Sequence, residues 1–153
     1  MTDENGITEC IILDLDGTLC NVDHRVEYAL TKQYDEFHSR LSGDKPNPAV
    51  QAIIRLLAVN LNILVVTGRN AKWRTQTERW LTKHGIIVDD LLMRPDDDFT
   101  KDHELKLLMI ERHFGSKEAV LKNVVMALED RDQVVEAFRN YGIPTWQVVE
   151  GAY

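Results

Sequence analysis

The feature that most constrains the fold is a repeated alternation between short apolar runs and amphipathic segments. The apolar runs are rich in branched side chains and too short for helices, which favours buried strands. We expect these strands over Glu9–Leu15, Asn62–Thr67, Leu91–Met93, Asn123–Leu128 and Thr145–Val149. Strands separated by helices in this way predict an α/β fold with a doubly wound, Rossmann-like parallel sheet of about five strands.

The intervening segments carry apolar side chains at helical spacing, which predicts amphipathic helices. They cover Asp23–Leu41, a segment that starts at Pro48 behind an Asn47 cap, Ala71–His84, Asp102–Phe114 and Arg131–Tyr141. We expect the apolar face of each helix to point into the core, with these residues: Val26, Leu30, Tyr34, Phe37, Leu41, Val50, Ile53, Ile54, Leu57, Leu105, Leu108, Met109, Val134, Val135 and Phe138. Trp73 and Trp80 share one helix face, and for them core packing is favoured over a base-stacking platform.

Length and composition are those of a globular domain. The chain has 153 residues, of which 44% are hydrophobic, so we expect a single domain over residues 1–153. No apolar run approaches the ~18 residues of a membrane span. Met1–Gly6 has no basic start, which argues against a secretory signal, and the two cysteines, Cys10 and Cys20, suit a reducing compartment. These features predict a cytoplasmic protein.

Polar side chains follow three of the predicted strands at the points where the strands end. Asp14 and Asp16 end the first strand, Thr67 ends the second, and Glu129 and Asp130 follow a later one. The carboxyl ends of parallel strands meet at one edge of a sheet, where ligands bind in open α/β folds. Carboxylates gathered there repel one another unless a cation neutralises them, and Mg²⁺ prefers oxygen ligands. The sequence therefore predicts a magnesium site at this edge.

Four ordered motifs resemble those of the haloacid-dehalogenase-like (HAD) phosphatase superfamily. They are Asp14–Leu19, Val65–Arg69, Lys106 and Leu128–Arg131. Three further stretches are similar to the 3′-phosphatase domain of bacteriophage polynucleotide kinase/phosphatase: Trp73–Trp80, Arg94–Lys106, and Leu128–Glu136 with its continuation to Val148. The resemblance implies a minimal helical cap after the first strand, over residues 20–46.

The superfamily resemblance implies a Mg²⁺-dependent phosphomonoesterase that works through an aspartyl-phosphate. Asp14 is then the nucleophile, and Asp16 is the general acid and base, which its acidic neighbours keep protonated part of the time. Thr67 and the amide of Gly68 donate hydrogen bonds to the phosphoryl oxygens. Lys106 offsets the negative charge of the nucleophile and the phosphate.

The same resemblance implies the metal ligands. Mg²⁺ is held by Asp14, Asp130 and the backbone carbonyl of Asp16. The related family usually has two aspartates where this chain has Glu129 and Asp130. Because glutamate is one methylene longer, Glu129 either reaches the metal through a water or pairs with Lys106.

The narrower resemblance implies removal of a 3′-phosphate from polynucleotide ends. It implies that Arg25 and Arg69 hold the substrate through their planar guanidinium groups. It also implies a role for Asp102, which lies one helical turn before Lys106 and could orient that lysine. No phosphate-cradling Gly-x-x-x-x-Gly-Lys-Ser/Thr loop occurs, so the kinase half is missing, and a separate kinase or ligase partner stays open.

Three alternative functions stay open. The net charge of −7 argues against a duplex-coating protein and mildly favours a small-molecule phosphatase acting on nucleoside monophosphates. Polynucleotide ends are favoured if the following basic residues surround one cleft: Arg25, Arg69, Lys72, Arg74, Arg79, Arg94 and Lys101. A phosphoacceptor signalling module uses the same residue types but lacks the Asp-x-Asp spacing. An inactive binding protein would not need the nucleophile, the acid and base, the lysine and the metal ligand together.

Overall fold

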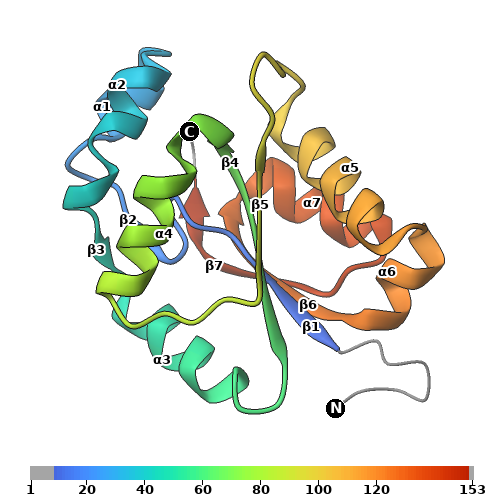
Figure 1. Cartoon of the computed structure of the whole chain (residues 1–153). Coiled ribbons are helices and arrows are strands. Elements are labelled where there is room, and N and C mark those ends of the chain that lie inside the picture. Colours follow the sequence, from blue (N-terminus) through green and yellow to red (C-terminus); the bar gives the residue numbers. More distant parts are fainter. Residues whose placement is uncertain (1–8, 152–153) are drawn as a thin grey trace.

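The central element is a parallel β-sheet. The computed structural model describes residues 9–151, so Met1–Gly6 lies outside the described part. The five-stranded sheet has the order β5-β4-β1-β6-β7, and every neighbouring pair is parallel (Figure 1). Its strands are β1 (Cys10–Leu13), β4 (Asn62–Asn70), β5 (Asp90–Arg94), β6 (Val124–Arg131) and β7 (Thr145–Gly151). The predicted doubly wound α/β fold is confirmed.

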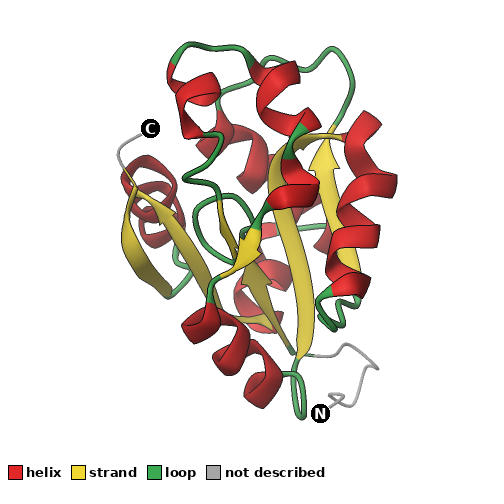
Figure 2. Cartoon of the chain, turned by 90° about the vertical axis from the view of Figure 1, so that its left-hand side faces the viewer, coloured by secondary structure: helices red, strands yellow, loops and turns green. Residues whose placement is uncertain are grey.

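Helices cover both faces of this sheet. On one side lie α3 (Pro48–Leu57) and α4 (Arg74–Lys83), as Figure 1 shows, and Figure 2 views the sheet from this side. The 3₁₀ turn η2 (Ala71–Trp73) precedes α4. On the other side lie α5 (Asp102–Phe114), α6 (Lys117–Asn123) and α7 (Asp132–Tyr141). The sequence reasoning missed α6, whose Ser116 cap accepts a hydrogen bond from Ala119 N at 3.1 Å.

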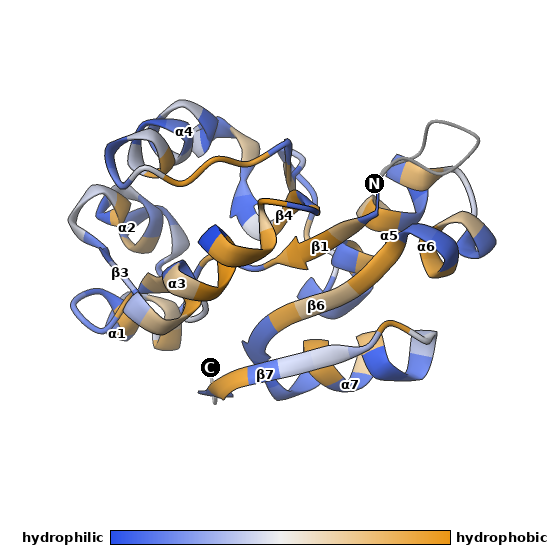
Figure 3. Cartoon of the chain, turned by 90° about the horizontal axis from the view of Figure 1, so that it is seen from below, coloured by the Kyte–Doolittle hydropathy of each residue, from blue (hydrophilic) through white to orange (hydrophobic). Residues whose placement is uncertain are grey.

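Two apolar cores result from this layering. Residues Ile11 and Leu13 of β1 face the core that contains Trp80. The alternating residue Ile12 faces the second core, with Phe138 of α7. Figure 3 shows the central strands β1, β4 and β6 as largely hydrophobic between helices of mixed character. The near-continuous apolar strands are expected for a parallel sheet buried on both faces.

The segment between β1 and α3 departs from the prediction. Instead of one helix over Asp23–Leu41, the structure has α1 (Val26–Leu30), α2 (Tyr34–Ser39) and the 3₁₀ turn η1 (Leu41–Gly43). Short strands β2 (Cys20–Asn21) and β3 (Lys45–Pro46) pair antiparallel at its base. The predicted cap segment, residues 20–46, therefore contains two short helices above a two-stranded ribbon.

The break between α1 and α2 has a local cause. Lys32 adopts φ 58°, in the left-handed region of backbone conformation, and Gln33 N donates to Tyr28 O at 2.7 Å. This is a common way for a right-handed helix to end. The break turns two side chains outward that a continuous helix would have buried. Leu30 is 63% exposed and Tyr34 is 55% exposed, so the prediction of a core position was wrong for both.

Other core predictions can be compared directly. Ile53 and Leu108 are 38% and 49% exposed, so their predicted core positions were wrong because they lie at the edges of the apolar stripes. Trp80 is buried, and its indole N–H donates to the backbone oxygen of Asp44 at 2.9 Å, which confirms the core role. Trp73 is half-buried. Among the described residues, no helix has the length and apolar character needed to cross a membrane.

Candidate active site

The predicted functional residues of the strands meet at the carboxyl edge of the sheet. Leu13 pairs with Val65 of β4 and with Leu128 of β6, so the residues that follow these positions are neighbours. Asp14 therefore lies between the end of β4, with Thr67, and the end of β6, with Glu129 and Asp130. The strand order reverses between β1 and β6, which is where open α/β sheets place ligand sites.

Lys106 of α5 is the cation at the centre of this group. Its Nζ lies 2.8 Å from Asp14 Oδ1, 2.8 Å from Glu129 Oε2 and 3.4 Å from Asp102 Oδ2. Burial lowers the pKa of Lys106, but the three carboxylates raise it by more than burial lowers it. The pKa therefore lies well above its ordinary value. Of the two arrangements expected for Glu129, the structure has the pair with Lys106.

Asp14 and Asp130 lie close together, and of the two only Asp14 forms an ion pair with Lys106. Thr18 Oγ1 is 2.9 Å from Asp14 Oδ2 and 3.2 Å from Asp130 Oδ1. Its single hydroxyl proton can therefore be donated to either carboxylate. Burial and the nearby Glu129 charge raise the pKa of Asp14 to about 7, against the lowering effect of Lys106. Burial and the Asp14 charge likewise raise the pKa of Asp130 to about 7.

This group has the donors that a hard divalent cation needs. Asp14, Glu129 and Asp130 each offer a carboxylate oxygen within 4.8 Å of the others. Both Glu129 oxygens are engaged, one with Lys106 and one with the backbone N–H groups of Asp130 and Arg131. Asp130 Oδ2 is buried and has no hydrogen-bond partner among residues 9–151. An unpaired buried carboxylate oxygen beside a second carboxylate fits a Mg²⁺ ligand set.

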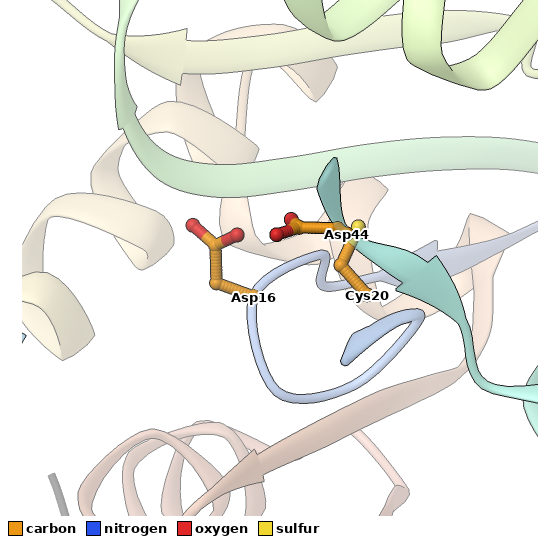
Figure 4. A group of neighbouring side chains, drawn as sticks. All are labelled: Asp16, Cys20 and Asp44. Carbon is orange, nitrogen blue, oxygen red and sulfur yellow. The ribbon is translucent and has the colours of Figure 1, made fainter. Parts of the chain in front are cut away.

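Asp16 belongs to a second, separate ionic cluster. Figure 4 shows its carboxylate near Asp44, with Cys20 beside them. Asp16 Oδ1 accepts from Arg25 Nη2 and Arg69 Nη2, each at 2.6 Å. Asp44 accepts from Arg25 Nε at 2.7 Å and from Arg69 Nη2 at 3.2 Å. Two arginines therefore neutralise the two carboxylates, and this cluster has no need of a metal.

The expected protonation of Asp16 is wrong. Burial raises the pKa of Asp16, but the guanidinium groups of Arg69 and Arg25 lower it more, so the pKa lies well below its ordinary value. The carboxylate is ionised at neutral pH. Arg25 and Arg69 are 0% exposed, so in this structure they hold Asp16 and Asp44 rather than reaching into open space for a substrate.

A cleft of about 620 Å³ opens above the site, between the cap and the β5–α5 loop. Asp14, Asp16, Thr67, Gly68, Asp102 and Lys106 all line it. Of the seven basic residues singled out in the sequence, Lys72, Arg94 and Lys101 line this cleft. Arg74 lines a different groove, and Arg25 and Arg69 are buried. The basic residues are thus divided rather than gathered round one opening.

The carboxyl-terminal part of β4 is held close to α5. A methyl group on Gly68 would overlap Asp102 Oδ1, so only glycine fits without displacing Asp102. Thr67 Oγ1 accepts a hydrogen bond from Arg69 N at 3.2 Å. Asp102 pairs with Arg131 at 3.2 Å, and burial is outweighed by Lys106 and that arginine, so the pKa of Asp102 is lowered.

Sequence reasoning missed three residues that shape the site. Thr18 lies within the first motif, and that position was the signal that could have identified it. In the structure its hydroxyl is buried between Asp14 and Asp130. Asp44 lies in a loop, and no pattern marks it as the partner of Arg25 and Arg69. His38 is buried beside the cleft with Nδ1 unpartnered among the described residues, and burial lowers its pKa to about 4, so the imidazole is neutral.

Comparison with known families agrees with this geometry. The family model described as the polynucleotide kinase PNKP phosphatase domain, a HAD-type family, matches residues 8–153. The chain belongs to this family. It is therefore a phosphatase domain of the HAD type, as its motifs predicted.

Two relatives of this chain are longer than the chain itself. A chain in the structure of the Pnkp1/Rnl/Hen1 RNA repair complex is 28% identical, with a TM-score of 0.82, and the match covers 100% of this chain and 46% of that one. A protein of Autographa californica nuclear polyhedrosis virus, provisionally described as a bifunctional polynucleotide kinase/RNA ligase, is 29% identical over 132 residues, which are 84% of this chain and 18% of that protein. The chain thus spans about half or less of these relatives.

The fold itself is more widely shared. A haloacid dehalogenase-like family hydrolase from Streptococcus pneumoniae has a TM-score of 0.65 at 13% identity, covering 95% of this chain and 88% of the other. At that identity the likeness concerns the fold alone.

Proposed function

We propose that this domain removes 3′-phosphate from polynucleotide ends, with Mg²⁺ and an aspartyl-phosphate at Asp14. One observation carries the proposal: Asp14 lines an open cleft and lies between a cation and a candidate metal ligand. The cation is Lys106, whose Nζ is 2.8 Å from Asp14 Oδ1, and the candidate ligand is Asp130, whose Oδ2 has no hydrogen-bond partner among the described residues. The kinship to a polynucleotide kinase phosphatase family and to a chain of an RNA repair complex supports nucleic-acid ends as the substrate. Residues 20–46 act as a small cap beside the cleft.

In the first step, a carboxylate oxygen of Asp14 attacks phosphorus while the bond to the ester oxygen breaks. Lys106 keeps a positive charge next to Asp14 throughout, which stabilises the negative charge that gathers there. Thr67 and the Gly68 amide, which line the cleft near Asp14, donate to the phosphoryl oxygens. The leaving oxygen takes a proton from solvent water, or from Asp16 where that carboxyl has been protonated, and departs as the terminal 3′-hydroxyl.

In the second step, water attacks phosphorus, the bond to Asp14 breaks, and inorganic phosphate leaves. Asp16 is our candidate to accept the proton of that water, because its ionised carboxylate lines the cleft beside Asp14. Its basicity rises when an arriving phosphate draws Arg25 and Arg69 away from it. The same carboxyl can donate a proton in the first step only if an arriving phosphate draws the arginines away. Arg25 and Arg69 would then contact the substrate after releasing Asp16.

Asp14 and Asp130 are the proposed Mg²⁺ ligands, and the Asp16 backbone carbonyl completes the protein's share. The bound ion would neutralise phosphoryl charge and align the phosphate with Asp14. Glu129 instead keeps Lys106 and the Asp130 backbone in place, because both of its oxygens are already engaged.

Binding of Mg²⁺ is expected to tighten with rising pH. The pKa values of Asp14 and Asp130 are about 7 in the metal-free protein, so at pH 6 both carboxyls bind protons that the ion must displace. We expect the apparent Kd to fall about tenfold or more between pH 6 and pH 8, measured by isothermal titration calorimetry. Asp130→Asn should remove this binding, whereas Asp96→Asn, an exposed loop carboxylate, should preserve it. Affinity that does not change with pH would contradict the site.

The substrate assignment is tested by phosphate release from matched substrates. We expect a 3′-phosphorylated oligonucleotide to react with a kcat/KM at least about 100-fold above that of its 5′-phosphorylated isomer. The two substrates differ only in the end that carries the phosphate, so this ratio measures recognition of that end. Chelation by EDTA should abolish release, and added Mg²⁺ should restore it. A preference for 5′ ends would overturn the assignment and leave the reaction class intact.

The division of the basic residues favours a second candidate, a phosphatase for nucleoside monophosphates. Asp97 and Asp98 line the same cleft as Lys72, Arg94 and Lys101, so the rim offers little net attraction to a polyanion. A higher kcat/KM for 3′-nucleoside monophosphates than for 3′-phosphorylated oligonucleotides would establish this candidate instead.

A further inference from the structure

Two aromatic rings stand at the mouth of the cleft without a role in the core. Phe99, in the loop between β5 and α5, is 92% exposed, and Tyr34, at the start of α2, is 55% exposed. Both line the cavity that contains Asp14 at its floor. Figure 1 shows α2 and the β5–α5 loop above the same end of the sheet, on either side of the carboxyl ends of the strands. The rings are therefore presented to whatever enters the cleft.

Neither ring is needed for folding. Both lie outside the two apolar cores of the molecule. The aromatic residue deeper in the cleft, Phe37, is by contrast buried, and the guanidinium of Arg25 lies 4.0 Å from its ring centroid. Single exposed apolar side chains are common on this protein, but Tyr34 and Phe99 line the same cleft and so offer a ligand two aromatic faces there.

The charges along the cleft do not favour recognition of a phosphodiester backbone. The lining contains Asp14, Asp16, Asp35, Asp97, Asp98 and Asp102 on the acidic side, and Lys72, Arg94, Lys101, Lys106 and Arg131 on the basic side. Most of these cations already have partners. Lys72 pairs with Asp35 at 2.6 Å, and Arg131 and Arg94 pair with Asp102 at 3.2 and 3.5 Å. A polynucleotide held here must gain its affinity from something other than net positive charge.

Stacking supplies such affinity, because every nucleobase has an apolar face that an aromatic ring can cover. We propose that Tyr34 and Phe99 form a nucleobase subsite that binds the terminal base of a single-stranded end while its 3′-phosphate reaches Asp14. The inference rests on the proposed function and goes beyond it, because it assigns the recognised part of the substrate to the base and not to the backbone. The tryptophan pair considered from the sequence cannot serve this purpose, since Trp80 is buried.

The test compares two single-stranded oligonucleotides that both end in a 3′-phosphate, one with a normal terminal nucleotide and one with a stable abasic terminal residue. We expect wild-type kcat/KM to be about tenfold or more higher for the substrate with the base, mostly through KM. Phe99→Ala and Tyr34→Ala should each bring this ratio to threefold or less. Phe99→Trp and Tyr34→Phe should retain it, because their rings still stack.

Leu30→Ala is the matched control, because Leu30 lies on the same cap as Tyr34 with a similar exposed fraction, 63% against 55%, but does not line the cleft. It should keep the wild-type ratio. The ratio should also stay the same when the salt concentration rises, since stacking does not depend on counterion release.

The outcomes separate the two proposals. A wild-type enzyme that hydrolyses both oligonucleotides equally well overturns the subsite and leaves the 3′-phosphatase function standing. An enzyme that cleaves p-nitrophenyl phosphate but neither oligonucleotide overturns both. A ratio that survives in Phe99→Ala and Tyr34→Ala also overturns the subsite, and a preference for 3′-nucleoside monophosphate over the oligonucleotide overturns the assignment to strand ends.

Discussion

Replacing Asp14 with asparagine is expected to lower phosphate release by about 10⁴-fold or more, because the amide cannot form the phosphoryl ester. The loss should appear in kcat, since an asparagine at this position leaves the cleft and its substrate contacts nearly unchanged in shape. Steady-state release from a 3′-phosphorylated oligonucleotide measures the effect. Rapid acid quenching followed by mass spectrometry should find a phosphoryl group on Asp14 in the wild type and none in the variant.

Asp96→Asn makes the same chemical change on an exposed loop residue that does not line the cleft, and it should leave kcat within about twofold of wild type. Folding of Asp14→Asn is checked by thermal unfolding. Substantial turnover by a folded Asp14→Asn protein would remove Asp14 from the role of nucleophile.

The largest expected effect on stability comes from Arg69→Gln. Arg69 is 0% exposed and contacts both Asp16 and Asp44, so its loss leaves two carboxylates to share Arg25 in a buried setting. Removing one partner from a buried ionic cluster costs about 3–5 kcal/mol. For a chain of this size that corresponds to a Tm lower by roughly 6 °C or more, measured by calorimetry. Arg55→Gln, on the exposed side of α3, should change Tm by about 1 °C or less.

The pH dependence of the stability difference between wild type and Arg69→Gln shows whether the ionic contact with Asp16 causes it. The arginines lower the pKa of Asp16 below its value in the unfolded chain, so this carboxylate stabilises the fold above pH ~4 and loses that contribution as pH falls. The stability gap between wild type and Arg69→Gln should therefore narrow as the pH falls below about 4. A gap that stays constant would attribute the loss to packing instead of the ionic contact with Asp16.

The sequence was sufficient to predict the sheet and the edge at which the candidate site residues meet. Periodicity and strand length identify β1, β4 and β6, and the rule that parallel strands end at one edge brings Asp14, Thr67 and Asp130 together. Lys106 came from the family resemblance, because a lysine in a helix has no periodic signal that separates a buried charge from a solvated one. The structure then shows it within 2.8 Å of Asp14.

The two remaining errors concern the protonation of Asp16 and the helices of the cap. The first arose from charged residues distant in the sequence, and the second from a local backbone turn. Asp16 was expected to be protonated part of the time because Asp14, Glu129 and Asp130 were expected to gather beside it at the sheet edge. In the structure its carboxylate instead contacts the guanidinium groups of Arg25 and Arg69. The cap was expected to be one helix because apolar spacing continues across Lys32, where the backbone turns left-handed. That turn places Tyr34 at the cleft, a position that helical spacing could not predict.

The Arg25–Asp44–Arg69 cluster has a mechanical consequence for entry and exit. Arg25 and Asp44 flank the two cap helices, Arg69 belongs to the sheet, and the indole of Trp80 ties the Asp44 backbone to α4. Swinging the cap outward would break several desolvated contacts at once. We therefore expect the cap to stay in place during turnover. Substrate entry and product release then depend on the fixed opening of the cleft and not on a movement of the cap.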